Sequence, residues 1–426
     1  MTENTPLSPP PRRTLSARAR WAVPAVVAVG VGVAFAAPPL LASADSSGLP
    51  PVTPEELVAA VASAEPQALS GTVVYTARLG LPSLPFGPET ADPVNLLDGS
   101  STLRVWTDGG ERSRVALLGD MSEFSVVHDG PEAWTYASSG DEVVHYTVSD
   151  ADRARYESMK DEATSGRAAG QVPGGADLPT PAEAASQVLD RAEQFSDVSL
   201  DAESTVAGRG AYQLVVTPKT PGTLVARVVV AIDAKTDTPL RVQVWSTKDA
   251  QTPALEVGFT DVTFATPSDS VLAFSAPAGA SVTEKVVTLP TDEQIAADHA
   301  KAASGTGLPE GVTVSGTGWA TVVQATGVDG PALVAGDPSA LADAPSGRPT
   351  IGSESAQGLL DQFGPQDGGG PASKFQGIDP ATLYDSLTTK VPQGHLISSA
   401  LLSVLITDDG RVLAGAVPPE TLQAMA

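Results

Sequence analysis

Residues 101–149 read STLRVWTDGGERSRVALLGDMSEFSVVHDGPEAWTYASSGDEVVHYTVS, and this segment has the most regular pattern in the chain. Apolar and polar residues alternate in five short segments: 102–106, 113–118, 122–127, 132–137 and 143–148. Gly, Asp, Ser and Pro stand between them: Asp108-Gly109-Gly110, Gly119-Asp120, Asp129-Gly130-Pro131 and Ser139-Gly140-Asp141. Alternation with a period of two is typical of a strand with one buried face. Short turns join antiparallel neighbours, so the stretch predicts an antiparallel meander.

The segment before the meander predicts one helix and one further strand. Thr53-Pro54-Glu55-Glu56 provides an N-cap and a proline in the first turn, which predicts a helix over 53–65. In residues 72–79 the apolar side chains share one face of the expected strand; they are Val73, Tyr75, Ala77 and Leu79.

A second helix and a second series of strands are expected after the meander. A polar, helical stretch is predicted over 149–163, and Thr180-Pro181-Ala182-Glu183 begins a capped helix that runs through residue 195. Five strands follow: 211–217, 223–232, 239–246, 254–264 and 271–276. We expect Asp233-Ala234-Lys235-Thr236-Asp237 to form the turn between the second and third of them.

About ten strands with few helices predict an α+β fold in which helices are segregated to one side of the sheet. A sheet of this width curls, so we expect a strongly curved antiparallel β-sheet, an incomplete barrel, with helices covering the concave side. An apolar concavity of this kind is the usual setting for a hydrophobic ligand.

The N-terminus has the pattern of a segment that enters a membrane. Four arginines in residues 1–20 precede Trp21–Ala44, a run of 24 residues without a charge. Basic flanks stay in the cytoplasm, which predicts an extracytoplasmic remainder. The run is long enough to span a bilayer as a transmembrane anchor, yet Ala42-Ser43-Ala44 fits signal-peptidase cleavage. A retained anchor and a removed signal peptide, which would give a secreted protein, therefore both stay open.

The composition excludes several classes of function. The chain has no cysteine, which rules out disulfides and thiolate metal sites, and its formal net charge is −25. Because nucleic-acid binding depends on basic surfaces, we expect no nucleic-acid partner. The four histidines have no metal-site spacing, and no nucleophile elbow or P-loop occurs. The sequence therefore predicts a protein that is not an enzyme and needs no cofactor or metal.

The C-terminal part, residues 286–426, predicts an additional and partly flexible unit. It contains an expected helix at 291–303, a strand at 312–325 and a Gly/Pro-rich stretch at 364–373. Two strands, 395–406 and 411–417, flank the turn Thr407-Asp408-Asp409-Gly410, which is the strongest hairpin signal in the chain.

Several phrases within residues 50–285 resemble a known family. They are Leu69-Ser70-Gly71-Thr72-Val73-Val74, Val230-Ala231-Ile232-Asp233, Pro239-Leu240-Arg241-Val242 and Phe274-Ser275-Ala276-Pro277-Ala278-Gly279-Ala280. Together with the N-terminal segment they are similar to actinobacterial members of the LolA-type lipoprotein-carrier superfamily, whose fold RseB-type sigma-factor regulators share. The resemblance implies a half-barrel with a helical lid that holds acyl chains of lipids or lipoproteins. An envelope sensor acting on a membrane partner, such as an anti-sigma factor, is the alternative.

Apolar and aromatic residues of the predicted strands are the candidate cavity lining: Val73, Tyr75, Phe124, Trp134, Tyr136, Tyr146, Val242, Val244 and Phe259. A cavity wall and a packed core have the same period of two, so these residues could equally form an ordinary core against the helices.

Overall fold

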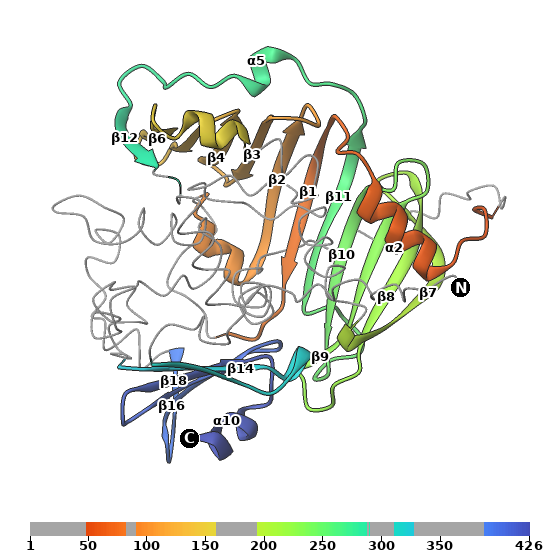
Figure 1. Ribbon diagram of the computed structural model, residues 1–426, viewed down its shortest axis with the longest axis vertical. Helices are drawn as coiled ribbons and strands as arrows, with labels where there is room; N and C mark the ends of the chain where they lie inside the picture. Colours follow the sequence, from red (N-terminus) through yellow and green to blue (C-terminus); the bar gives the residue numbers. More distant parts are fainter. Residues whose placement is uncertain (1–47, 82–90, 159–193, 288, 290–310, 328–386) are drawn as a thin grey trace, which may run out of the picture.

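The computed structural model describes residues 48–81, 91–158, 194–287, 289, 311–327 and 387–426. Within them the chain forms a twelve-stranded sheet and a separate six-stranded sheet, with few helices (Figure 1). The large sheet is curved and has the strand order β12-β6-β5-β4-β3-β2-β1-β11-β10-β9-β8-β7. Its two edge strands do not pair with each other, so the sheet is not closed into a barrel.

The first half of the large sheet confirms the predicted meander. Six consecutive strands pair antiparallel with their sequence neighbours. They are β1 (Leu69–Ala77), β2 (Gly99–Thr107), β3 (Arg112–Leu118), β4 (Glu123–Asp129), β5 (Glu132–Ala137) and β6 (Glu142–Val148). The short 3₁₀ helix η1 (Pro93–Leu97) lies against β1 and β2.

The second half continues from the middle of the sheet, because β11 pairs with β1. Its strands are β7 (Ser196–Val206), β8 (Arg209–Pro218), β9 (Val225–Asp233), β10 (Pro239–Ser246) and β11 (Leu255–Thr263). Four of them are the predicted strands, and the turn after Asp233 lies where it was predicted. Strand β7 was not predicted.

The predicted strand 271–276 is wrong. Residues 264–287, which we call the strap, leave β11 and form the short helix α5 (Asp269–Leu272), which packs on β2, β3 and β4. The strap ends in β12 (Ser281–Val287), which pairs parallel with β6. Leu272 is 1% exposed, and packing of the strap explains the apolar alternation that resembled a strand. The parallel pair also corrects the expectation of a purely antiparallel sheet.

The large sheet has two chemically different faces. Residues that are directly opposite each other in the ladder lie on the same face, so the register assigns each side chain. One face, called the apolar face, carries buried residues from both halves: Val73, Leu103, Leu117, Phe124, Val230 and Val242. The other, called the reverse face, carries Arg104, Arg114, Trp134, Arg241 and Glu256.

The predicted N-terminal helix is confirmed as α2 (Pro54–Ser63). The Thr53 hydroxyl accepts from the Glu56 N–H, and the Glu56 carboxylate accepts from the Thr53 N–H, which is a capping box. Leu57 is 1% exposed and belongs to the core cluster of the large sheet. Helix α2 lies across β7 and β8 in Figure 1 and contacts β7.

The C-terminal unit is a six-stranded sheet of order β13-β14-β18-β17-β16-β15 with helix α10 (Pro419–Met425) against it. Its strands are β13 (Val312–Ser315), β14 (Val322–Thr326), β15 (Thr389–Val391), β16 (Gly394–Ser398), β17 (Ser403–Thr407) and β18 (Arg411–Gly415). The hairpin at Thr407–Gly410 is confirmed. The single strands predicted over 312–325 and 395–406 are each two strands, separated by the 3₁₀ helix η2 (Gly318–Ala320) and by a turn at 399–402.

The two sheets are joined by backbone and side-chain hydrogen bonds. The Leu224 N–H donates to the Ala416 carbonyl at 2.7 Å, and the Ala400 N–H donates to the Leu79 carbonyl at 2.7 Å. Leu401, 1% exposed, is part of the core cluster of the large sheet. The second unit is therefore packed onto the large sheet.

Several predictions lie outside the described residues: the tail 1–20, the segment 21–44, the helix 291–303, the stretch 364–373, and most of the helix 180–195. Of the stretch 149–163, residues 153–158 are described as helical. In the part of the chain that the structure describes, no helix is both long and apolar enough to span a bilayer.

Candidate functional site

Seven of the nine candidate lining residues lie on the apolar face. The register places them there: Val73, Tyr75, Phe124, Tyr146, Val242, Val244 and Phe259. Six are at most 7% exposed, and Val244 is half-buried. They come from β1, β4, β6, β10 and β11, so strands far apart in the sequence contribute to one surface.

Trp134 and Tyr136 do not lie on this surface. Both alternate with buried Ala133 and Thr135 on β5, and the register places them on the reverse face. There the strap covers them, because the Phe274 ring lies 5.8 Å from the ring of Trp134 and 6.3 Å from that of Tyr136. The expectation that Trp134 and Tyr136 share a face with Val73 and Phe124 is therefore wrong. They pack under the strap on the reverse face.

The apolar face holds almost no charge. In β1–β5 and β8–β11 the register places no Asp, Glu, Lys or Arg on it. The charged residues of these strands stand on the reverse face, where Arg104 and Arg114 flank the Trp106 ring and Arg227 lies 4.2 Å from the Trp245 ring. This segregation is the main chemical feature of the sheet.

Tyr75 places a deeply buried polar group on the apolar face. Its side chain is 1% exposed, and its hydroxyl has no hydrogen-bond partner among the described residues. Burial raises the pKa of Tyr75 well above its ordinary value. A neutral, unpaired hydroxyl in apolar surroundings is costly, and it could donate a hydrogen bond to a polar atom of a ligand.

His128 lies on the apolar face near the opposite end of the strands, between Ser113 on β3 and Ala133 on β5. Burial lowers the pKa of His128 to about 4, because the charged imidazolium loses its hydration. Its Nδ1 has no hydrogen-bond partner in the described part of the chain. The side chain is therefore neutral at pH 7, in keeping with the absence of charge on this face.

A separate cavity of about 230 Å³ lies on the reverse face, over the centre of the sheet. Strands β1, β10 and β11 provide its floor, and the tip of the β7–β8 hairpin provides the opposite wall. Phe259 borders this cavity as well, since it stands at the register shift between β1 and β11. Sequence patterns gave no indication of this site, because it depends on the approach of the β7–β8 hairpin to β1, β10 and β11.

The remaining histidines show no metal site. The described residues contain no group of three or more His, Asp or Glu side chains arranged to hold a metal ion. His145 lies 3.3 Å from a Glu132 oxygen and 2.8 Å from a Glu284 oxygen, and it stacks on Trp134. Its contacts tie β12 to β6. His395 lies 3.0 Å from the Thr388 hydroxyl, and His299 is outside the described residues.

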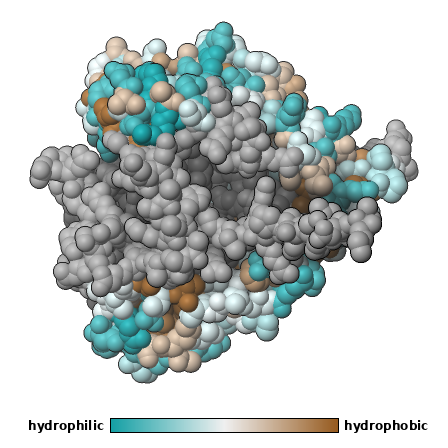
Figure 2. Space-filling model, in the orientation of Figure 1, coloured by the Kyte–Doolittle hydropathy of each residue, from teal (hydrophilic) through white to brown (hydrophobic). Residues whose placement is uncertain are grey.

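Hydropathy is mixed over the visible surface, with polar residues frequent over both the upper and the lower part of the molecule (Figure 2). Among the described residues few large hydrophobic side chains are strongly exposed, and two of them, Val282 and Val286, stand on β12.

Comparison with known proteins gives similarity in structure alone. No family model matches the chain, and no curated protein matches its sequence. Among solved structures, the chain is similar to the MucA/MucB complex of Pseudomonas aeruginosa at 18% identity and a TM-score of 0.38, covering 87% of this chain and 96% of that one. It is also similar to a LolA superfamily protein of Nitrosomonas europaea, at 9% identity and a TM-score of 0.22, covering 53% of this chain and 99% of that one. LprF of Mycobacterium bovis matches at 12% identity and a TM-score of 0.25, with 52% and 100% covered. The actinobacterial affiliation stays a prediction.

Proposed function

We propose that this is an extracytoplasmic, non-catalytic protein that holds a hydrophobic ligand against the apolar face, with acyl chains of a lipid or lipoprotein as the ligand class. The observation that carries the proposal is the absence of Asp, Glu, Lys and Arg from this face in β1–β5 and β8–β11. Burial of acyl methylenes against such a surface contributes about 0.8 kcal/mol each.

The central test is native mass spectrometry of the full chain after purification from a membrane-containing host. We expect an adduct with the mass of an acyl lipid, and we expect a fluorescent palmitate analogue to displace it in a titration. A ligand-free protein that also binds no palmitate analogue would overturn the proposal and leave the apolar face as an ordinary core.

A reciprocal pair of variants locates the binding surface. Val244 and Gln243 are adjacent on β10, both half-buried, and point to opposite faces. Val244→Gln places an amide on the apolar face and should weaken palmitate binding at least tenfold. Gln243→Val removes only a hydrogen bond to Glu256 on the reverse face and should leave binding unchanged. Equal effects of the two variants would argue against a ligand on the apolar face.

A second candidate function is an envelope sensor that acts through a membrane partner such as an anti-sigma factor. The observation that favours it is the additional six-stranded unit, which is bonded to the large sheet through Leu224, Ala400 and Ser246. Co-expression with a candidate anti-sigma factor is the test. We expect a complex that survives size-exclusion chromatography under this hypothesis, and loss of that complex when the C-terminal unit carries Leu401→Asp.

A further inference from the structure

The cavity on the reverse face contains charged and hydroxyl groups that the proposed acyl site does not use. Val74, Thr76, Gly258 and Thr260 form part of its lining, and Arg241 and Glu256 bring two opposite charges into it. The register places Val74, Thr76, Gly258, Arg241 and Glu256 on the reverse face, on the far side of the sheet from the apolar face. Phe259, at the register shift, is the one candidate acyl-lining residue that also borders the cavity, and the charged groups of the cavity lie on the side away from the apolar face.

The two charges are close but are not paired with each other. Arg241 is directly opposite Gly258 and Glu256 is directly opposite Gln243, so Arg241 and Glu256 are diagonal neighbours on the same face. The structure shows no ion pair between them. The only described bond of the Arg241 guanidinium is a long one of 3.4 Å to the Gln213 amide oxygen. The Glu256 carboxylate accepts from the Gln243 amide at 3.0 Å. Both groups thus keep most of their hydrogen-bonding capacity for the cavity.

Thr76 gives independent evidence that the cavity binds a polar ligand. Its side chain is 1% exposed, yet its hydroxyl makes no hydrogen bond within the described residues. A buried polar group without a partner costs on the order of 1–3 kcal/mol, so an unpaired hydroxyl beside a cavity indicates a place where a polar ligand atom fits.

Gly258 keeps the floor of the cavity open. A Cβ atom at this position would lie 2.8 Å from Cγ of Arg241, so any side chain would displace the arginine stem or fill the space. The arginine can lie flat over the strand only because this residue is glycine.

We infer that this cavity binds a small zwitterion of amino-acid size. The ligand carboxylate pairs with Arg241, its ammonium group pairs with Glu256, and the Thr76 hydroxyl donates to or accepts from the same ligand. Opposite charges that are held apart on one surface are complementary to a molecule that carries both charges a short distance apart. A volume of about 230 Å³ accommodates such a molecule.

The test is a calorimetric titration of the full chain with glycine and L-serine, with acetate and methylammonium as the two half-ligands. We expect each amino acid to bind at least tenfold more tightly than either half-ligand. In the NMR spectrum of the same protein, the amide signals of Val74 and Gly258 should shift on addition of serine. Absence of binding, or equal binding of acetate and serine, would overturn the assignment.

Variants test whether binding depends on the residues that line the cavity or on any charge of the reverse face. Arg241→Gln and Glu256→Gln should each weaken serine binding at least tenfold, and Gly258→Ala should weaken it while it keeps both charges. Arg227→Gln is the matched control, because Arg227 also stands on the reverse face but does not line the cavity. If Arg227→Gln and Arg241→Gln have equal effects, the cavity is not the binding site. Binding of the palmitate analogue should be unchanged in all four variants, so this inference and the proposed function fail independently.

Discussion

Ala207 carries a local backbone strain at the wall of the reverse-face cavity. It occupies the first position of the two-residue turn between β7 and β8, with φ of 50°, and Gly208 follows with φ of 74°. Two positive φ values in succession are typical of a type I′ turn, where Asn-Gly is preferred. An alanine in this region is strained by roughly 1 kcal/mol, because its Cβ approaches the carbonyl oxygen.

Ala207→Gly should therefore stabilise the protein by up to about 1 kcal/mol, which corresponds to a rise of a few degrees in the unfolding temperature. Differential scanning calorimetry of the full chain measures this shift. Gly208→Ala is the matched control and should lower the unfolding temperature, since it creates the same strain one residue later. A lower unfolding temperature for Ala207→Gly would contradict the turn geometry.

The buried His128 should make the stability of the protein depend on pH. Burial lowers its pKa to about 4, whereas the unfolded chain has the ordinary value of about 6.5. Between these values the unfolded state binds more protons than the folded state, so stability falls as pH decreases through this window. From pH 7.5 to pH 5 the expected loss from this residue is about 2 kcal/mol. Urea denaturation at both pH values measures it, and His128→Gln should remove about this part of the slope. An unchanged slope in the variant would show that other groups cause it.

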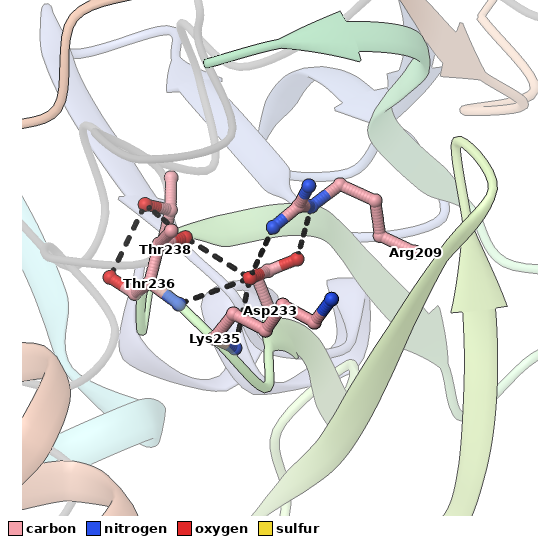
Figure 3. Close-up of polar contacts among 5 residues, drawn as sticks. All are labelled: Arg209, Asp233, Lys235, Thr236 and Thr238. Carbon is pink, nitrogen blue, oxygen red and sulfur yellow. Dashed lines mark hydrogen bonds and ion pairs between the residues drawn. The ribbon is translucent and has the colours of Figure 1, made fainter.

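The β9–β10 hairpin is organised by one buried carboxylate. Asp233 is 1% exposed and accepts hydrogen bonds from the Arg209 guanidinium, from the N–H groups of Lys235 and Thr236, and from the Thr236 hydroxyl (Figure 3). Burial alone would raise the pKa of Asp233, but the bonds from Arg209, Lys235 and Thr236 outweigh it, and the pKa is lowered. Arg209 also covers the Phe264 ring at 4.5 Å, so the hairpin is tied to the end of β11.

Asp233→Asn should destabilise the protein by about 3 kcal/mol at pH 7, because it leaves the arginine without a carboxylate. Because the folded-state pKa is lowered, the stabilisation is present above the unfolded pKa of about 3.9 and is lost as pH falls through the folded value. The difference in free energy of unfolding between wild type and variant, measured by urea denaturation, should therefore become smaller in strong acid. Arg209→Lys, which keeps the charge but loses the paired geometry, should cost less than Asp233→Asn. An equal difference at all pH values would exclude the ionised carboxylate as the cause.

Strands with a clear apolar face were predictable, and strands without one were not. The segment 239–246 alternates cleanly and became β10. In β12 most residues are exposed, so no buried face marks it in the sequence, and its parallel pairing with β6 is not local. In β7 the alternation of Val198 and Leu200 was a usable signal, but the register shift after Asp201 interrupts the period.

In the whole molecule, sequence periodicity predicted which side chains of a strand share a face. It did not predict which other segment of the chain packs on each face. On β5 the large residues Trp134 and Tyr136 suggested the ligand face, yet the small residues Ala133 and Thr135 stand on it. The strap packs on the other side, where its Phe274 ring contacts both aromatic rings. For the same reason the cavity beside Arg241 was not predictable, since it depends on how the β7–β8 hairpin approaches β11.

The contact between the two sheets depends on a short turn that was not predicted from the sequence. Residues 399–402 insert between β16 and β17 and place Leu401 in the core cluster of the large sheet, while the Ser246 hydroxyl donates to the Ala400 carbonyl at 2.6 Å. Leu401→Ala removes buried methyl groups at this contact and should cost about 2 kcal/mol or more of the free energy that holds the units together.

Amide hydrogen exchange measures this cost locally. The N–H groups of Leu224 and Ala400 donate across the junction, and in Leu401→Ala their exchange should accelerate at least about thirtyfold. Amides between β17 and β18 lie inside the second unit and should retain most of their protection. Glu420→Gln, at an exposed position on α10, is the control and should change neither set. Equal acceleration of the junction and the β17–β18 amides would mean that the units unfold only together, and that the junction is no weaker than the sheets that it joins.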